Sequence, residues 1–155
     1  MIDLFDELTA VVGILDGECI PYALIGGVAY SFYVEARATE DIDFLVRPED
    51  WDRILSTLQP LGYRDVTGPL NLKELRFRRL TKALEDDSLV LDFLLADERA
   101  LEGISRAIEV PLGSRRVRLA PPEFLIAMKR GRNSPQDRSD IAGLEKYILN
   151  QRRSK

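Results

Sequence analysis

The sequence predicts an α/β (α+β) domain, in which strand-like and helical segments alternate along the chain. Three observations support this fold class. Apolar residues recur at helical spacing in some segments, short apolar runs have the length of buried strands in others, and Gly or Pro residues separate the two kinds. At 155 residues and 45% hydrophobic content, the chain can form one domain with a substantial core. We expect a single domain over residues 1–155, with a core at about 20–100 and a C-terminal helical part at about 120–150.

The first third of the chain is predicted to alternate helix and strand twice. Apolar residues from Leu4 to Leu15 repeat at helical spacing, and Asp16-Gly17 ends this helix. A buried strand, a Gly-Gly turn and a helix follow, and a second strand begins with acidic residues. The predicted ranges are a helix at 2–15, a strand at 22–25, a helix at 28–35 and a strand at 41–46.

The remaining elements follow from the same signals. Pro48 and neighbouring acids open a helix, as the helix dipole favours, and Asp97 is a candidate cap for a later helix. Residues 151–155 are expected to form a frayed basic tail. The predicted ranges are a helix at 48–61, strand-like segments at 63–66, 72–81 and 88–96, a helix at 98–105, a hairpin at 111–119 and helices at 124–130 and 137–148.

The composition excludes several kinds of chemistry. The chain has no histidine, which removes Ser-His-Asp and Cys-His catalysis, histidine-ligated zinc and a histidine general base. Chemistry must therefore use carboxylates, Lys, Arg, Tyr or a metal ion held by oxygen. The net charge of −4 argues against bulk binding of nucleic acid but leaves room for a local basic face.

The composition also bears on location. The single cysteine, Cys19, rules out an internal disulfide and suits a reducing compartment. The first residues are acidic from Asp3 onward, unlike a signal peptide, and no apolar run approaches the length of a membrane span. We expect a cytoplasmic protein that makes no contact with a membrane.

A basic segment at 72–82 leaves two interpretations open. From residue 76 onward it carries four cationic side chains among the apolar residues of a predicted strand. Such a strand can be a solvated edge, which charges protect against pairing with another chain. It can also present a positive surface to a polyanion. The four residues are Arg76, Arg78, Arg79 and Lys82.

The strongest candidate site lies at residues 22–46. Asp41 and Asp43 are two apart on a predicted strand, so their side chains point to the same face and can share a divalent cation. Gly26 and Gly27 lie where a strand gives way to a helix, where backbone can approach a phosphate. Mg²⁺ beside a phosphate cradle is typical of phosphoryl or nucleotidyl transfer. Taken singly, Gly-Gly is also a common turn, and Asp-x-Asp a common exposed loop.

Asp92 is a carboxylate within a run of large apolar residues. Burying it costs free energy unless it is paired or binds a cation. One interpretation is an ion pair with an arginine. The other, which we favour, is a third acid of the metal site, on a strand adjacent to Asp41 and Asp43.

The pattern Gly26-Gly27-x13-Asp41-Ile-Asp43 resembles the signature of the polymerase-beta-type nucleotidyltransferase superfamily. The longer runs at residues 23–29 and 37–43 are most similar to the small bacterial branch that includes abortive-infection (AbiEii-like) nucleotidyltransferase toxins. The resemblance covers residues 22–144. It implies a mixed, mostly antiparallel sheet flanked by helices, with a C-terminal helical pair beside the cleft.

The resemblance also implies roles for individual residues. Asp41, Asp43 and Asp92 would bind Mg²⁺ or Mn²⁺ with the triphosphate, and Asp92 would activate the attacking hydroxyl as a metal ligand or as a base. Gly26 and Gly27 would hold phosphates through backbone groups, and Lys129 would neutralise charge in the transition state. The remaining nucleotide-binding candidates are Arg37, Thr39, Arg132 and Asp137. The alternative for the C-terminal residues is an amphipathic helix pair with ordinary surface ion pairs.

The resemblance therefore predicts an enzyme that moves an NMP from an NTP to an acceptor, which could be RNA, a protein hydroxyl or a small molecule. A toxic activity and a small antitoxin partner are possible in that branch. Two other classes remain open: an inactive module that binds nucleotide or a partner protein, and an interaction module whose acids serve only the fold.

Overall fold

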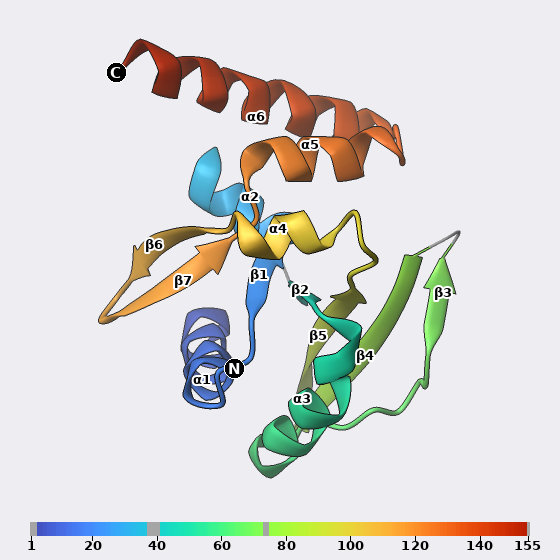
Figure 1. Ribbon diagram of the computed structural model, residues 1–155. Helices are drawn as coiled ribbons and strands as arrows, with labels where there is room; N and C mark the ends of the chain where they lie inside the picture. Colours follow the sequence, from blue (N-terminus) through green and yellow to red (C-terminus); the bar gives the residue numbers. More distant parts are fainter. Residues whose placement is uncertain (1–2, 37–40, 73–74, 155) are drawn as a thin grey trace.

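The computed structural model describes residues 3–36, 41–72 and 75–154, and shows one continuous seven-stranded sheet with helices packed against it (Figure 1). The strand order is β3-β4-β5-β2-β1-β7-β6. Strands β1 and β7, and strands β2 and β5, pair in parallel, and the other four pairs are antiparallel. The predicted mixed, mostly antiparallel sheet is thus confirmed. The strands are β1 (Tyr22–Ile25), β2 (Asp41–Val46), β3 (Leu70–Leu72), β4 (Leu75–Leu84), β5 (Asp87–Leu95), β6 (Ile108–Leu112) and β7 (Arg115–Leu119).

The helices begin where the sequence carries capping signals. Asp3 accepts hydrogen bonds from the backbone N–H groups of Phe5 and Asp6 at the start of α1, and Ser134 and Asp137 form a capping box at the start of α6. The helices are α1 (Leu4–Gly17), α2 (Gly26–Tyr33), η1 (Pro48–Asp50), α3 (Trp51–Leu58), η2 (Gln59–Leu61), α4 (Leu101–Ser105), α5 (Pro122–Arg130) and α6 (Pro135–Arg153).

Four sequence-based expectations need correction. The segment predicted as a strand at 63–66 forms only an isolated bridge, between Arg64 and Thr81, and Gly62 and Gly68 flank it with positive φ. The segment at 72–81 is divided between β3 and β4. Strand β4 is an interior strand of the sheet rather than its edge. The tail predicted to fray from residue 151 continues α6 as far as Arg153, where basic residues in the last turn suit the helix dipole.

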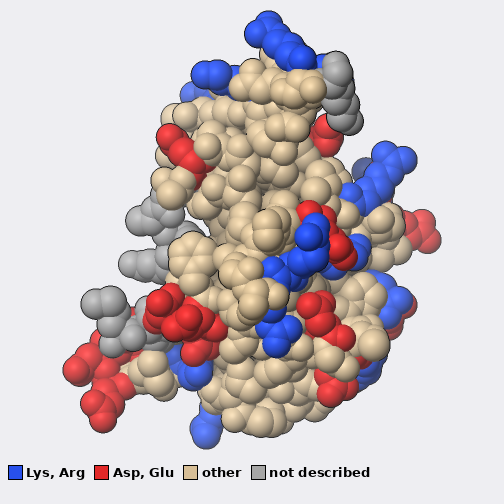
Figure 2. All heavy atoms as spheres, turned by 90° about the vertical axis from the view of Figure 1, so that its left-hand side faces the viewer, with Lys and Arg blue, Asp and Glu red and all other residues tan. Residues whose placement is uncertain are grey.

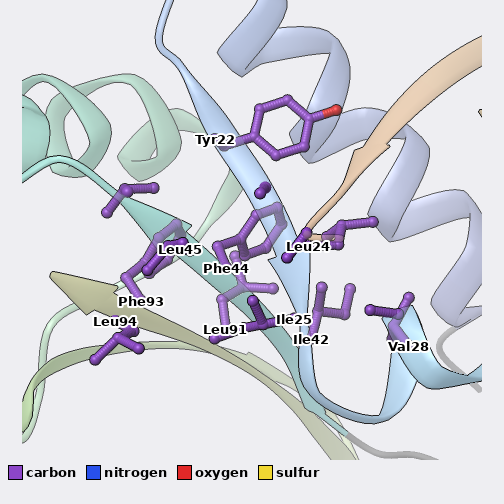
Figure 3. Packing of buried hydrophobic residues seen from close by; sticks show 14 of the residues in the cluster. Tyr22, Leu24, Ile25, Val28, Ile42, Phe44, Leu45, Leu91, Phe93 and Leu94 are labelled. Carbon is purple, nitrogen blue, oxygen red and sulfur yellow. The ribbon is translucent and has the colours of Figure 1, made fainter. Parts of the chain in front are cut away.

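The core is centred on the inner strands. Phe44 of β2 and Phe93 of β5 stack with ring centroids 5.0 Å apart, and Tyr22 lies edge-on to Phe44 (Figure 3). Trp51 of α3 packs against Phe93 at 5.4 Å, so α3 covers this face of the sheet. On the opposite face, α4 lies so close to β2 that a Cβ added at Gly103 would meet Leu45 at 2.7 Å.

The C-terminal helices α5 and α6 pack together above the end of the sheet where β1 ends and β2 begins (Figure 1). The phenol of Tyr33 in α2 donates a buried 2.8 Å hydrogen bond to the carbonyl of Ala120, just before α5. The backbone N–H of Ala120 also donates to the carbonyl of Leu24 in β1. These contacts fix the helical pair over the candidate site.

The face of the molecule that α1 and the β6–β7 hairpin occupy carries charges of both signs. Figure 2 shows acidic and basic side chains interspersed there, with basic side chains at the top. Residues Arg152 and Arg153 lie in the last turn of α6. Within the described ranges, no helix combines the length and the apolar character needed to cross a bilayer.

Candidate active site

Asp43 lies at the centre of a row of residues on one face of the sheet. It pairs in register with Ile25 of β1 on one side and with Asp92 of β5 on the other. Residues in register on paired strands point to the same face, so the carboxylates of Asp43 and Asp92 are neighbours. Asp41 shares this face because it is two residues away on β2. The structure therefore brings the three predicted acids to one face on adjacent strands.

Gly26 makes a close approach to Asp43. It has φ of +69°, and a Cβ at this position would lie 2.1 Å from Asp43 Oδ2. Both the backbone conformation and the contact demand glycine. Gly26 is also the first residue of α2, and Gly27 is the second, so the early N–H groups of this helix lie beside the carboxylate. Among the residues that the structure describes, no side chain caps this helix end.

The electrostatic environment of Asp43 disfavours a negative charge. Burial, followed by the negative charges of Asp92 and Asp41, raises the pKa of Asp43 to about 7. The positive charges of Arg132 and Arg79 act in the opposite direction. A bound cation would relieve both the burial penalty and the repulsion between acids. The carboxylates of Asp41 and Asp43 therefore fit a divalent cation with oxygen ligands.

Asp92 is already held by an arginine. Arg79 Nε donates to Asp92 Oδ1 at 2.8 Å, and Arg79 Nη2 donates to Asp92 Oδ2 at 3.0 Å. This is a bidentate pair between neighbouring strands, and 14% of the Asp92 side chain remains exposed. The ion pair that the sequence left as an alternative thus exists, on the same face as Asp43. In the part of the chain that the structure describes, no three acidic or cysteine side chains gather closely enough to hold a metal ion.

Lys129 is buried in a second charged cluster, on the helical pair. Its Nζ lies 2.8 Å from Asp140 Oδ2 and 4.0 Å from Asp137 Oδ1, and the residue is only 5% exposed. Gln136 donates to the other oxygen of Asp140 at 2.8 Å. The alternative of ordinary surface ion pairs is therefore wrong for Lys129, because α5 and α6 enclose the pair between them.

Arg132 connects the two clusters. Its Nη2 donates to Asp137 Oδ1 at 2.9 Å, while its positive charge offsets part of the rise in the pKa of Asp43. A hydrogen bond from Ser134 lowers the pKa of Asp137, with Arg132 and Lys129 contributing in the same direction. A hollow of about 380 Å³ opens among these side chains. The hollow is lined by Lys129, Arg132, Ser134, Gln136, Asp137 and Asp140.

Two predicted nucleotide-binding residues, Arg37 and Thr39, lie outside the described residues. The predicted site did not include Arg79, nor Ser134, Gln136 and Asp140 of the second cluster. Arg79 had a usable signal, because an arginine on a strand beside a buried acid is a candidate partner for it. Strand pairing cannot be predicted from this pattern, however, so Arg76, Arg78, Arg79 and Lys82 are equally good candidates for that partner. For Gln136 we find no signal in the sequence.

Comparison with known proteins identifies the fold. No protein-family model and no curated protein matches the chain. Among solved structures, the lincosamide antibiotic adenylyltransferase LnuA in its lincomycin-bound form has a TM-score of 0.64 at 14% identity, over 90% of this chain and 95% of that one. ANT(2")-Ia in complex with adenylyl-2"-tobramycin has a TM-score of 0.60 at 15% identity, over 94% and 92%.

A provisionally named nucleotidyltransferase, TM1012 from Thermotoga maritima, has a TM-score of 0.61 at 12% identity, over 94% of this chain and 92% of that one. The chain therefore has the polymerase-beta-like nucleotidyltransferase fold. At these identities the likeness shows the fold alone. It gives no support to the abortive-infection branch in particular.

Proposed function

We propose that this protein is a nucleotidyltransferase, which uses Mg²⁺ or Mn²⁺ to move an NMP from an NTP to a hydroxyl acceptor. The observation that carries the proposal is the environment of Asp43, a half-buried carboxylate beside two other acids and in contact with the glycine that starts α2. Repulsion between these acids does not stabilise the fold, whereas neighbouring carboxylates supply the oxygen ligands of a cation site. We further propose that residues 1–155 act as one domain, since a single sheet joins the seven strands that the structure describes.

The residues of β2 and α2 would bind the nucleotide. Asp41 and Asp43 would hold the cation, which supplies charge neutralisation on the triphosphate. Mg²⁺ is commonly bound by one or two carboxylates together with substrate phosphates, so two acids suffice. Gly26 and Gly27 would direct backbone N–H groups at the start of α2 toward phosphate oxygens.

The transfer itself would use Asp92. The acceptor's hydroxyl oxygen attacks the α-phosphorus while its proton passes to the Asp92 carboxylate. The bond from the α-phosphorus to the oxygen that bridges to the β-phosphorus breaks, and pyrophosphate leaves with the electron pair. Arg132, whose side chain is 65% exposed, and Lys129 would offset the negative charge that develops. Arg37, Thr39 and Asp137 remain proposed nucleotide-binding residues.

For the acceptor, we favour a small molecule with hydroxyl groups. Of two proteins with a similar fold, LnuA is a lincosamide antibiotic adenylyltransferase with lincomycin bound, and ANT(2")-Ia is in complex with adenylyl-2"-tobramycin. Each is matched over more than 90% of its length. The chain is thus about as long as the matched small-molecule enzymes. An RNA end or a protein hydroxyl would be a different outcome of the same experiment. A toxin role with a small antitoxin partner rests only on the sequence resemblance.

The test is to incubate the protein with each α-labelled NTP, Mg²⁺ or Mn²⁺, and cell extract, and then to separate small molecules, RNA and protein. We expect the label to move from the NTP into a small-molecule product other than NMP. With Asp43→Asn, no such labelled product should form. Label in RNA or protein would change the acceptor class. Calorimetry without any Mg²⁺-dependent NTP binding would contradict the proposal. Binding without turnover would support the inactive nucleotide-binding module instead.

A further inference from the structure

We infer that Arg79 is a positioning residue, which orients Asp92 toward the acceptor hydroxyl and keeps it out of the coordination of the cation. This inference rests on the proposed function. It chooses between the two roles that the sequence leaves open for Asp92, metal ligand or base, and it assigns a role to a residue of the basic strand.

The register of three strands places Arg79 in the acid row. Arg79 of β4 pairs with Asp92 of β5, which pairs in turn with Asp43 of β2. Across this face, Asp92, the candidate base, therefore lies between Arg79 and Asp43, the candidate cation ligand. Both oxygens of Asp92 accept from the same guanidinium, at 2.8 and 3.0 Å. A bidentate fork fixes the plane of a carboxylate as well as its position.

This geometry suits a base better than a metal ligand. Each carboxylate oxygen keeps lone pairs beyond the one that faces the guanidinium, so Asp92 can still accept a hydroxyl proton. Arg79 cannot take that proton itself, because arginine is not deprotonated in proteins. A divalent cation on Asp92 would lie near a fixed positive charge, which repels it. The described residues also show no three-acid cluster that could hold a metal ion.

The neighbouring Arg78 provides a matched control. It also pairs with an aspartate, Asp65, and its guanidinium lies 4.9 Å from the centre of the Trp51 ring. Both arginines therefore tie β4 to a partly buried carboxylate. Successive residues of a strand face opposite sides, so Arg78 points away from the acid row. A purely structural role for Arg79 predicts similar effects of the two substitutions on activity, and a positioning role does not.

The first experiment separates binding from turnover in Arg79→Ala, Arg79→Lys and Arg78→Ala. Calorimetry with Mg²⁺ and a non-hydrolysable ATP analogue gives nucleotide affinity, and release of labelled AMP from ATP, with water as acceptor, gives kcat. We expect Arg79→Ala to lower kcat by about 10- to 100-fold, as for residues that orient catalytic groups, while nucleotide Kd changes less than about threefold. Arg79→Lys should recover part of kcat, and Arg78→Ala should keep parent values per folded molecule.

The second experiment asks whether Arg79 acts through Asp92. If it does, the double variant Arg79→Ala/Asp92→Asn should be no slower than Asp92→Asn alone. Binding of Mn²⁺ with the ATP analogue, followed by electron paramagnetic resonance, should survive Asp92→Asn and be lost in Asp43→Asn. Parent-like kcat in Arg79→Ala, additive losses in the double variant, or loss of Mn²⁺ in Asp92→Asn would each overturn the inference while leaving the proposed function intact. A parent protein that binds no Mg²⁺-dependent nucleotide would overturn both.

Discussion

Two pairs of residues, one step apart in the sequence, serve opposite purposes on the two faces of the sheet. Phe44 and Phe93 stack in the core at 5.0 Å and are fully buried. The preceding residues of the two strands, Asp43 and Asp92, form the adjacent register pair, and their side chains lie on the other face. The same two strands thus join an apolar face to an acidic one.

The difference between the faces lies in their energetics. Stacked aromatic rings add roughly 0.5–1.5 kcal/mol beyond the effect of their buried area. On the acidic face, burial of Asp43, followed by repulsion from Asp92 and Asp41, raises the pKa of Asp43 to about 7. We infer that the Phe face stabilises a pair of strands rigid enough to keep the acids together. The comparison predicts that substitutions on one face change activity and substitutions on the other change stability.

The largest expected effect is on transfer, in Asp43→Asn. The amide keeps the size of the side chain but removes a negative ligand of the cation. The transition state therefore loses several kcal/mol of stabilisation by the cation, and transfer falls by about 10³-fold or more. The fold should be unchanged, as measured by circular dichroism. Transfer within tenfold of the parent would remove Asp43 from the reaction.

Phe93→Ala should show the reverse pattern. Loss of a buried phenyl ring that packs against Phe44 and Trp51 should lower the free energy of unfolding by about 3–5 kcal/mol, as measured in urea. Leu149→Ala, at a side chain that is 53% exposed, is the control and should change stability by less than about 0.5 kcal/mol. If Phe93→Ala unfolds no more easily than the control, the apolar face does not hold the strands.

Lys129 tests whether the helical pair belongs with the acidic face. Lys129→Ala removes the cation beside the buried carboxylate of Asp140, and should lower stability by about 3 kcal/mol. If the residue also serves the nucleotide, affinity measured under conditions where the variant is folded should fall too, and Lys129→Arg should restore it only in part. Lys146→Ala, at an exposed position of α6, is the control. A stability loss with parent-like NTP affinity would make Lys129 purely structural.

The smallest expected effect is the pH dependence of stability without metal. Asp43 titrates near 7 in the folded state and near 3.8 when unfolded, so the folded state holds the extra proton between these values. The free energy of unfolding contributed by Asp43 should therefore fall by at most a few kcal/mol as pH rises from 4 to 7. The difference between the parent and Asp43→Asn isolates this contribution. A difference that does not change with pH would contradict the raised pKa.

The sequence predicted the acidic face more fully than its surroundings. The boundaries of β1 and β2 follow from apolar runs bounded by glycine and charged residues, and they agree with the structure residue for residue. The shared face of Asp41 and Asp43 needs only the two-residue period of a strand. Local patterns of this kind are sufficient wherever neighbours in sequence are neighbours in space.

The partners of these residues could not be predicted, because they depend on strand pairing. Which of Arg76, Arg78 and Arg79 meets Asp92 is decided by the register of β4 against β5. The burial of Lys129 depends on the packing of α5 on α6, which no local pattern specifies. The continuation of α6 through Arg153 differs from the frayed tail that the basic residues at 151–155 predict, because basic side chains also suit the last turn of a helix.

The central claim is that the acidic face binds a cation together with a nucleotide. The most direct test is the melting temperature of the parent and of Asp43→Asn, each measured at pH 8 alone, with Mg²⁺, with a non-hydrolysable ATP analogue, and with both. The account predicts that Mg²⁺ and the analogue together raise the melting temperature of the parent more than the sum of their separate effects, and that Asp43→Asn loses this increase. An equal increase in both proteins, or none in the parent, would contradict the claim.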